Sequence, residues 1–222
     1  MAAGTIAPPR PTRRTRRRNP PPPEGGGGGD GDRGGPRETS SGDGGDRARL
    51  GLMLALVGMT TLFVVFLIAS LLLRSNAPSW PPPGAPVPPR GLWISTLVIL
   101  ASSATFVLAT RARDPRALRR RLAWTLDLGI LFLVVQALLW RTVFASGRFT
   151  FSDAYGTIFY SLTGLHAAHV LGGLVFLFRT LRRARRDPTA PRTRVAVSLC
   201  STYWHFMGAV WVVLFVVLEL MS

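Results

Sequence analysis

Five long apolar runs dominate this sequence of 222 residues and leave little choice of fold. They cover residues 50–73, 91–110, 122–140, 154–178 and 195–218, and the shortest has 19 residues. About 20 residues of α-helix, at roughly 1.5 Å per residue, cross the hydrocarbon core of a bilayer. A backbone inside lipid must satisfy its own hydrogen bonds, so apolar runs of this length form helices. The sequence therefore predicts an all-α, polytopic membrane helix bundle with five transmembrane helices.

The charged residues lie mainly between these runs and predict an orientation. All 27 basic residues are arginines, and the formal net charge is +16. The N-terminal segment, the second loop and the fourth loop together hold 23 of them; the other side has Arg74, Arg90, Arg141 and Arg148. The positive-inside rule places arginine-rich segments in the cytoplasm, so we expect a cytoplasmic N-terminus and a C-terminus outside. A nucleic-acid-binding protein would instead gather its basic residues on one folded surface, and no nucleic acid is expected as a partner.

Residues 1–49 differ in composition from the rest of the chain. They are rich in arginine, proline and glycine and contain almost nothing that can be buried. Such a segment cannot offset its ordering entropy, so we expect a disordered cytoplasmic tail ahead of a membrane domain over residues 50–222. No apolar segment follows the early arginines, so a secretory signal is not expected. Cys200 is the only cysteine, which excludes a disulfide within the chain.

Three histidines inside the predicted spans are the first candidates for chemistry. His166 and His169 lie in the fourth run and His205 in the fifth. His166 and His169 are three residues apart on one helix, so they cannot bind opposite faces of one haem. A metal site would need a third ligand, and only His205 is available among the histidines. We therefore expect the histidines to form hydrogen bonds between helices or to lipid headgroups, and predict no catalytic, cofactor-binding or metal-binding residue.

Small and aromatic residues in the last two runs predict helix packing. Gly164, Ala168 and Gly172 recur every four residues, a spacing that lets a neighbouring backbone approach closely. Trp204 and Trp211 are seven residues apart and so share one face of the last helix. A structural role, either packing between helices or facing lipid, is as good an interpretation of these tryptophans as a functional one.

Asp127 is the one carboxylate inside the five runs. It lies about one and a half turns into the third run, and two interpretations remain open. Its side chain either reaches back to Arg120 or Arg121 at the interface, or it takes part in proton transfer. Nothing in the sequence has the pattern of a nucleophile–base pair or a phosphate-binding loop.

Four short motifs occur in order along the chain. Residues 152–157 read S-D-A-Y-G-T, and residues 163–173 read T-G-L-H-A-A-H-V-L-G-G. Residues 203–206 read Y-W-H-F, followed by Val210 and Trp211. Residues 80–84 read W-P-P-P-G, and Ser102, Ser103 and Thr105 follow in the second run. In sequence and order these motifs resemble those of the subunit III family of haem–copper oxidases, such as cytochrome c oxidase, in its short, five-helix bacterial form.

The resemblance implies a role without redox chemistry in this chain. It implies two helix groups separated by a cleft that holds phospholipid, in the plasma membrane of a bacterium. It also implies docking on oxidase subunit I, which with subunit II carries the haems and copper. The expected roles are to stabilise subunit I, to hold lipids and to support oxygen and proton access during aerobic electron transport.

The sequence departs from the family pattern at three positions where acids are usual. Met59, Leu139 and Gly208 stand there instead, which weakens any expected role in proton movement. The departures leave room for an accessory subunit of nitric oxide reductase, from the same superfamily. A transporter or an independent haem-binding membrane cytochrome is a further alternative, although no inverted repeat favours a transporter.

Overall fold

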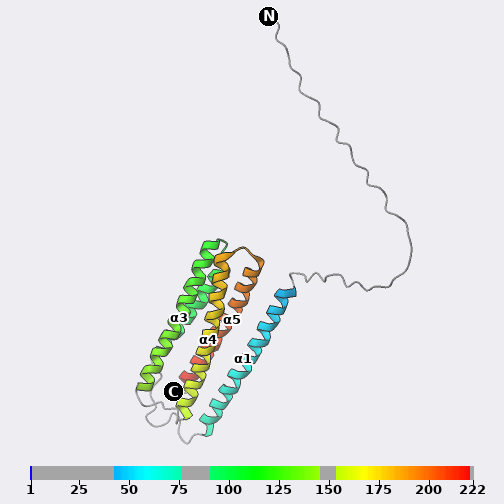
Figure 1. Ribbon diagram of the computed structural model, residues 1–222. Coiled ribbons are helices and arrows are strands. Elements are labelled where there is room, and N and C mark those ends of the chain that lie inside the picture. The colour runs from blue at the N-terminus through cyan, green and yellow to red at the C-terminus, as the bar shows by residue number, and fades with distance from the viewer. Residues whose placement is uncertain (2–42, 77–90, 146–153, 221–222) are drawn as a thin grey trace, which may run out of the picture. The chain divides into compact units, whose positions relative to one another are not determined.

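The computed structural model describes residues 43–76, 91–145 and 154–220, together with Met1. These residues form α1 (Asp43–Asn76), α2 (Gly91–Thr110), α3 (Pro115–Ala145), α4 (Ala154–Arg186) and α5 (Pro191–Leu220) (Figure 1). Each of the five is long and apolar enough to cross a membrane, which confirms the five predicted helices. The predicted disorder of the tail as far as residue 42 and the proline-rich loop at residues 80–89 lie outside the described residues.

Four of the five helices extend beyond the apolar runs that predicted them. α1 begins at Asp43 instead of residue 50, and α3 begins at Pro115 instead of residue 122. α4 continues to Arg186, and α5 begins at Pro191. Arginine is a good helix former, so a helix continues past the lipid boundary where hydropathy falls. The predicted boundary at residue 50 therefore marks the start of the apolar run and not the start of the helix.

Short turns join α2 to α3 and α4 to α5, and an aspartate stabilises each turn. The carboxylate of Asp114 accepts the backbone N–H groups of Arg116 and Ala117 at 3.2 and 3.1 Å. Asp187 similarly accepts the backbone N–H groups of Thr189 and Ala190. A proline then occupies the first turn of α3 and of α5, where its missing N–H costs nothing. Each turn reverses the chain, so the joined helices are antiparallel neighbours.

Helices α2 to α5 form a closed group in which each helix contacts two others. α2 packs on α3, α3 on α4, α4 on α5, and α5 returns to α2. We call this the four-helix group. α1 lies outside it, against α4 and α5 (Figure 1).

A narrow stripe of side chains holds α1 to the four-helix group. Leu56 and Phe63 are buried, and Leu52, Met59 and Leu67 pack beside them. These residues recur every three or four positions, so they share one face of the helix. Most other apolar side chains of α1 are exposed, which leaves the greater part of its surface to lipid or to another chain.

Candidate functional site

Two tryptophans of α5 connect the four-helix group through hydroxyl groups. Trp204 Nε1 donates to Ser102 Oγ at 3.1 Å, and Trp211 Nε1 donates to Thr96 Oγ1 at 3.1 Å. Ser102 Oγ in turn donates to the carbonyl of Thr125 on α3. Both indole rings are almost fully buried. Of the two interpretations of these tryptophans, the structure favours packing between helices over contact with lipid.

Two further bonds connect α4 to its neighbours. The hydroxyl of Tyr203 donates to the carbonyl of His169 at 2.8 Å, and Trp140 Nε1 donates to Thr163 Oγ1 at 3.2 Å. In an apolar interior an indole N–H or a phenol O–H needs a partner, and these bonds supply it. These interhelical bonds in the apolar part of the group come from tryptophan, tyrosine and hydroxyl side chains.

Among the described residues the three histidines make no hydrogen bond to another helix, and the alternative of bonds to lipid headgroups stays a prediction. His166 is fully buried among the rings of Phe63, Phe132 and Trp211, with ring centroids 6.3, 5.8 and 5.0 Å away. Neither of its ring nitrogens has a hydrogen-bond partner among the described residues. An aromatic cage of this kind holds the imidazole by packing alone.

His169 and His205 are placed differently from His166. His169 Nδ1 pairs with the carbonyl of Leu165 on its own helix at 2.8 Å. His205 is half-buried with its ring centroid 6.1 Å from that of Phe106. Within the described part of the chain, no three His, Cys, Asp or Glu side chains group closely enough to hold a metal ion. The arrangement offers packing and not ligation.

The small residues Gly164, Ala168 and Gly172 do not pack against another helix backbone of this chain. Gly164 is half-buried, and Ala168 and Gly172 are exposed. Gly164 and Ala168 line a shallow groove of about 310 Å³ between α3 and α4, beside Gln136. The side-chain amide of Gln136 is buried there without a partner among the residues described.

The close approaches of the four-helix group occur at other glycines. A methyl group added at Gly129 would lie 2.7 Å from Cη2 of Trp204 and 2.8 Å from Cδ2 of Leu174. A methyl group added at Gly173 would lie 2.8 Å from Cε1 of Tyr203. Within the described chain the close approaches thus fall at Gly129 and Gly173, and the packing of the Gly164, Ala168 and Gly172 face against another helix stays a prediction.

Asp127 is exposed on α3, and the structure does not pair it with an arginine. Arg121 instead donates to the carbonyl of Leu108 at the end of α2. Arg120 makes no ion pair with Asp127 among the described residues. The carboxylate therefore faces outward from the apolar part of α3.

The three positions where the sequence lacks the expected acids all have apolar or small neighbours. Met59 packs against the main core from α1, and Leu139 is buried against Gly91. A methyl group added at Gly208 would lie 3.1 Å from the hydroxyl of Ser103, so a larger side chain there must displace it. These sites are built for packing in this chain.

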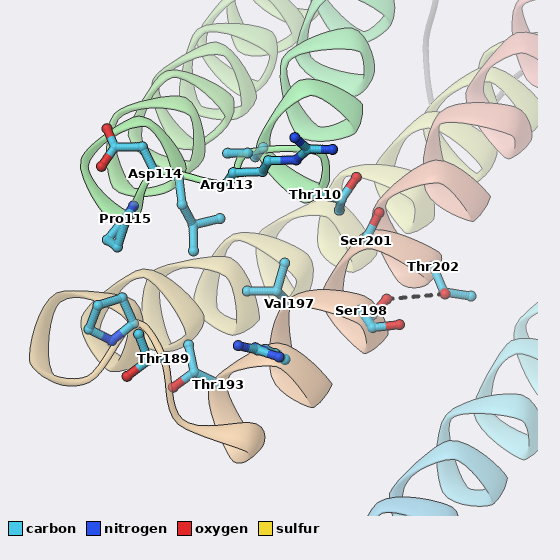
Figure 2. Close-up of a pocket in the computed structure, with 15 residues that line it drawn as sticks. Thr110, Arg113, Asp114, Pro115, Thr189, Thr193, Val197, Ser198, Ser201 and Thr202 are labelled. Atoms are coloured by element: carbon cyan, nitrogen blue, oxygen red, sulfur yellow. Dashed lines mark hydrogen bonds between the residues drawn. The ribbon is translucent and has the colours of Figure 1, made fainter.

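One cavity was not predicted from the sequence. It has a volume of about 650 Å³ and lies between the α2–α3 turn and the first turns of α5. Figure 2 shows Arg113, from the α2–α3 turn, extending toward Thr110 on one side of the cavity, with Val197 and Ser201 of α5 on the other. The arginine-rich loops could have indicated this cavity from the sequence, but their arginines were used only to predict the orientation of the chain in the membrane.

Comparison with known proteins gives one consistent match. The profile of the family described as "Cytochrome c oxidase subunit III" matches residues 45–222. The chain is 36% identical over 143 residues to "Probable cytochrome c oxidase subunit 3" of Mycobacterium tuberculosis, covering 63% of this chain and 70% of that protein. It is 32% identical over 183 residues to the Synechocystis "Cytochrome c oxidase subunit 3", covering 79% of this chain and 76% of that one. The Alkalihalophilus pseudofirmus protein of the same name is 33% identical over 177 residues, covering 78% and 86%.

Proposed function

The chain belongs to the cytochrome c oxidase subunit III family and is a multi-pass membrane protein of a bacterial respiratory oxidase. From this membership we propose that the chain stabilises the catalytic subunit I and holds lipid. Haem and copper belong to its partners, subunits I and II, and this chain supplies none of their ligands. The observation that carries the proposal is the completeness of the four-helix group. Tyr203, Trp204 and Trp211 find their hydrogen-bond partners inside the chain, so the outward apolar faces of the group remain for lipid and for subunit I.

The test is recovery of the partners from membranes. The chain is purified in mild detergent through a tag on its N-terminal tail, and the product is examined by its reduced-minus-oxidised spectrum. We expect haem-containing subunit I and subunit II to co-purify. A stable homo-oligomer without haem would contradict the proposal and favour transport. A Soret band that stays with the isolated chain would favour a haem-binding cytochrome.

The relatives are named as oxidase subunits, which favours oxygen reduction over nitric oxide reduction by the complex. The recovered partners decide this directly. Subunit I of an oxidase supports the proposal, and subunits of a nitric oxide reductase would overturn it.

The orientation is part of the proposal and rests on the arginine distribution. The two described turns, Arg111–Asp114 and Asp187–Ala190, together with their flanking helix ends, hold most of the arginines of the second and fourth loops. In the proposed orientation both turns face the cytoplasm. A reporter that is active only outside the cytoplasm should be active after Ser222 and inactive at Arg116. The reverse pattern would overturn the orientation.

Asp127 bears on whether the chain also moves protons. It is exposed and is the only carboxylate in the five apolar runs, and the family's acid positions hold Met59, Leu139 and Gly208. A proton path needs a chain of groups, and these replacements interrupt it. We therefore expect Asp127→Asn to leave the initial turnover rate of the assembled oxidase unchanged, as measured by oxygen consumption. A steep fall in the turnover rate of the Asp127→Asn complex, with normal assembly, would instead support a role of Asp127 in proton transfer.

A further inference from the structure

The cavity at the arginine-rich end of the four-helix group is not used by any role described so far. Its volume of about 650 Å³ is typical of small-molecule sites, which run from roughly 300 to 1,000 Å³. Residues from the α2–α3 turn form one wall, and residues from the start of α5 form the other (Figure 2). Two loops far apart in the sequence thus build one site.

Two arginines that line this cavity have no counter-ion. The guanidinium groups of Arg113 and Arg194 make no hydrogen bond or ion pair with any described residue. Neighbouring arginines are used differently, because Arg119 and Arg121 each donate to a backbone carbonyl at a helix end. Both side chains are exposed at the cavity, so their N–H groups are free to bind an anion there.

The single carboxylate of the lining is already engaged. Asp114 accepts the backbone N–H groups of Arg116 and Ala117, and these bonds hold its pKa below the usual value for an aspartate. The negative charge of Asp114 interacts with the first N–H groups of α3 and can balance at most one of the two positive guanidinium groups. The cavity remains positive.

The rest of the lining divides into hydroxyl groups and an apolar wall. Ser198 and Ser201, one turn apart on α5, line the cavity, and their hydroxyls make no hydrogen bond within the described part of the chain. Ala109, Leu118 and Val197 add apolar surface beside them. Free donors next to apolar surface suit a molecule with a charged end and a hydrocarbon end.

We propose that this cavity binds the phosphate group of an anionic phospholipid, with Arg113 and Arg194 on the phosphate and Ser198 and Ser201 donating to its oxygens. Arginine is well suited to phosphate because its planar guanidinium can donate two parallel hydrogen bonds. The cavity lies where the arginine-rich turns meet the apolar spans, at the depth of lipid headgroups, and basic pockets between helices at this level take anionic lipids. The lipid belongs to the cytoplasmic leaflet in the proposed orientation. The inference rests on the proposed function and gives lipid holding a defined site.

The test uses the whole oxidase complex, purified in mild detergent and freed of loosely bound lipid. Phosphatidylglycerol is titrated in, and bound lipid is counted by native mass spectrometry for the unaltered complex and for Arg113→Gln/Arg194→Gln. The matched control is Arg116→Gln/Arg192→Gln, which removes the same charge from nearby arginines that are equally exposed but do not line the cavity. An arginine beside an anionic headgroup contributes about fivefold in affinity, so we expect roughly 25-fold weaker binding of one phosphatidylglycerol in the cavity variant. The control should retain the affinity of the unaltered complex.

Other outcomes would overturn the assignment in distinguishable ways. Equal weakening in the cavity variant and the control would mean diffuse surface charge and no site. Equal binding of phosphatidylcholine would remove the selectivity for anions. Competition by inorganic phosphate at comparable affinity would make this a site for free phosphate and not for lipid. Loss of another subunit from the cavity variant, with lipid binding unchanged, would assign the cavity to an acidic protein segment. None of these results alters the co-purification of haem, so failure here is separate from failure of the proposed function.

Discussion

Helices α1 and α5 have similar composition but are held in the protein in different ways. In the most apolar stretch of each helix, 6% of α1 residues are buried against 44% of α5 residues. α5 donates two indole hydrogen bonds to α2 and one phenol bond to α4. The hydroxyl groups of α1 bond to its own backbone, and Arg74 at its end donates to the carbonyl of Leu220 on α5. In lipid, hydropathy does not decide which helices pack together, because the solvent is as apolar as the side chains.

The difference divides the chain into a self-sufficient part and a dependent part. The four-helix group has interlocking side chains and directional bonds that specify a single arrangement. α1 has a stripe of contacts along one face and a wide apolar surface on the other. We expect the four-helix group to respond strongly to changes in packing and α1 to respond weakly unless a partner covers it.

The largest effect is expected from the tryptophan at the centre of the group. Trp211 is fully buried, packs on Phe132 with ring centroids 4.9 Å apart, and donates to Thr96. Trp211→Ala should destabilise the assembled complex by about 3 kcal/mol, the low end for a buried tryptophan because lipid and not water surrounds the group. The measurement is the thermal midpoint of the complex in detergent. Phe66→Ala on α1, where the ring is 38% exposed, is the control and should change the midpoint little. Equal losses from both changes would mean that α1 is as tightly packed as the four-helix group.

Two glycine-to-alanine substitutions, each adding one methyl group, compare the packing of the four-helix group with that of α1. Gly129→Ala forces its methyl group against Trp204 and Leu174, which should cost about 1–3 kcal/mol of stability. Gly58→Ala on α1 meets nothing within 4 Å and should be neutral or slightly stabilising, since alanine favours helix by up to about 1 kcal/mol. Both are read from the same thermal midpoint. A clear loss in Gly58→Ala would show that another chain's backbone lies against α1 in the complex.

The smallest effect is expected at the buried histidine. His166 fills space among three aromatic rings and has no hydrogen-bond partner among the described residues. Leucine is of similar size and carries no polar group to bury, so His166→Leu should change the stability by less than about 1 kcal/mol. The haem content of the complex should also be unchanged. Loss of haem from a complex that still assembles would give this imidazole a role beyond packing.

Five helices could be predicted from the sequence because apolar length alone requires them in lipid. The ends of the helices could not be predicted in the same way. α1 begins at Asp43 and α3 at Pro115, in charged sequence where hydropathy does not mark a helix boundary. The hydrogen bond from Trp204 to Ser102 could not be predicted from the sequence either, because it depends on which helices are neighbours.

The candidate site was predicted less completely than the fold. His166 and Trp211 were identified separately, but their contact in one aromatic cluster needs the packing of α4 against α5. A four-residue spacing of small residues marks a possible contact face, but the close approach inside the described chain falls at Gly173, which the spacing does not single out. The face of Gly164 stays a predicted contact for another helix. The cavity needed Arg113 and Arg194 to be brought together by two turns about 80 residues apart.

The central claim is that this chain stabilises the oxidase and takes no part in its chemistry. Oxygen consumption is followed over time, from the first turnovers until activity is lost, for complexes with and without this chain at equal haem content. The account predicts the same initial rate in both and a shorter working lifetime in the complex that lacks the chain. An initial rate that falls steeply on removal, with haem retained and a lifetime unchanged, would contradict it.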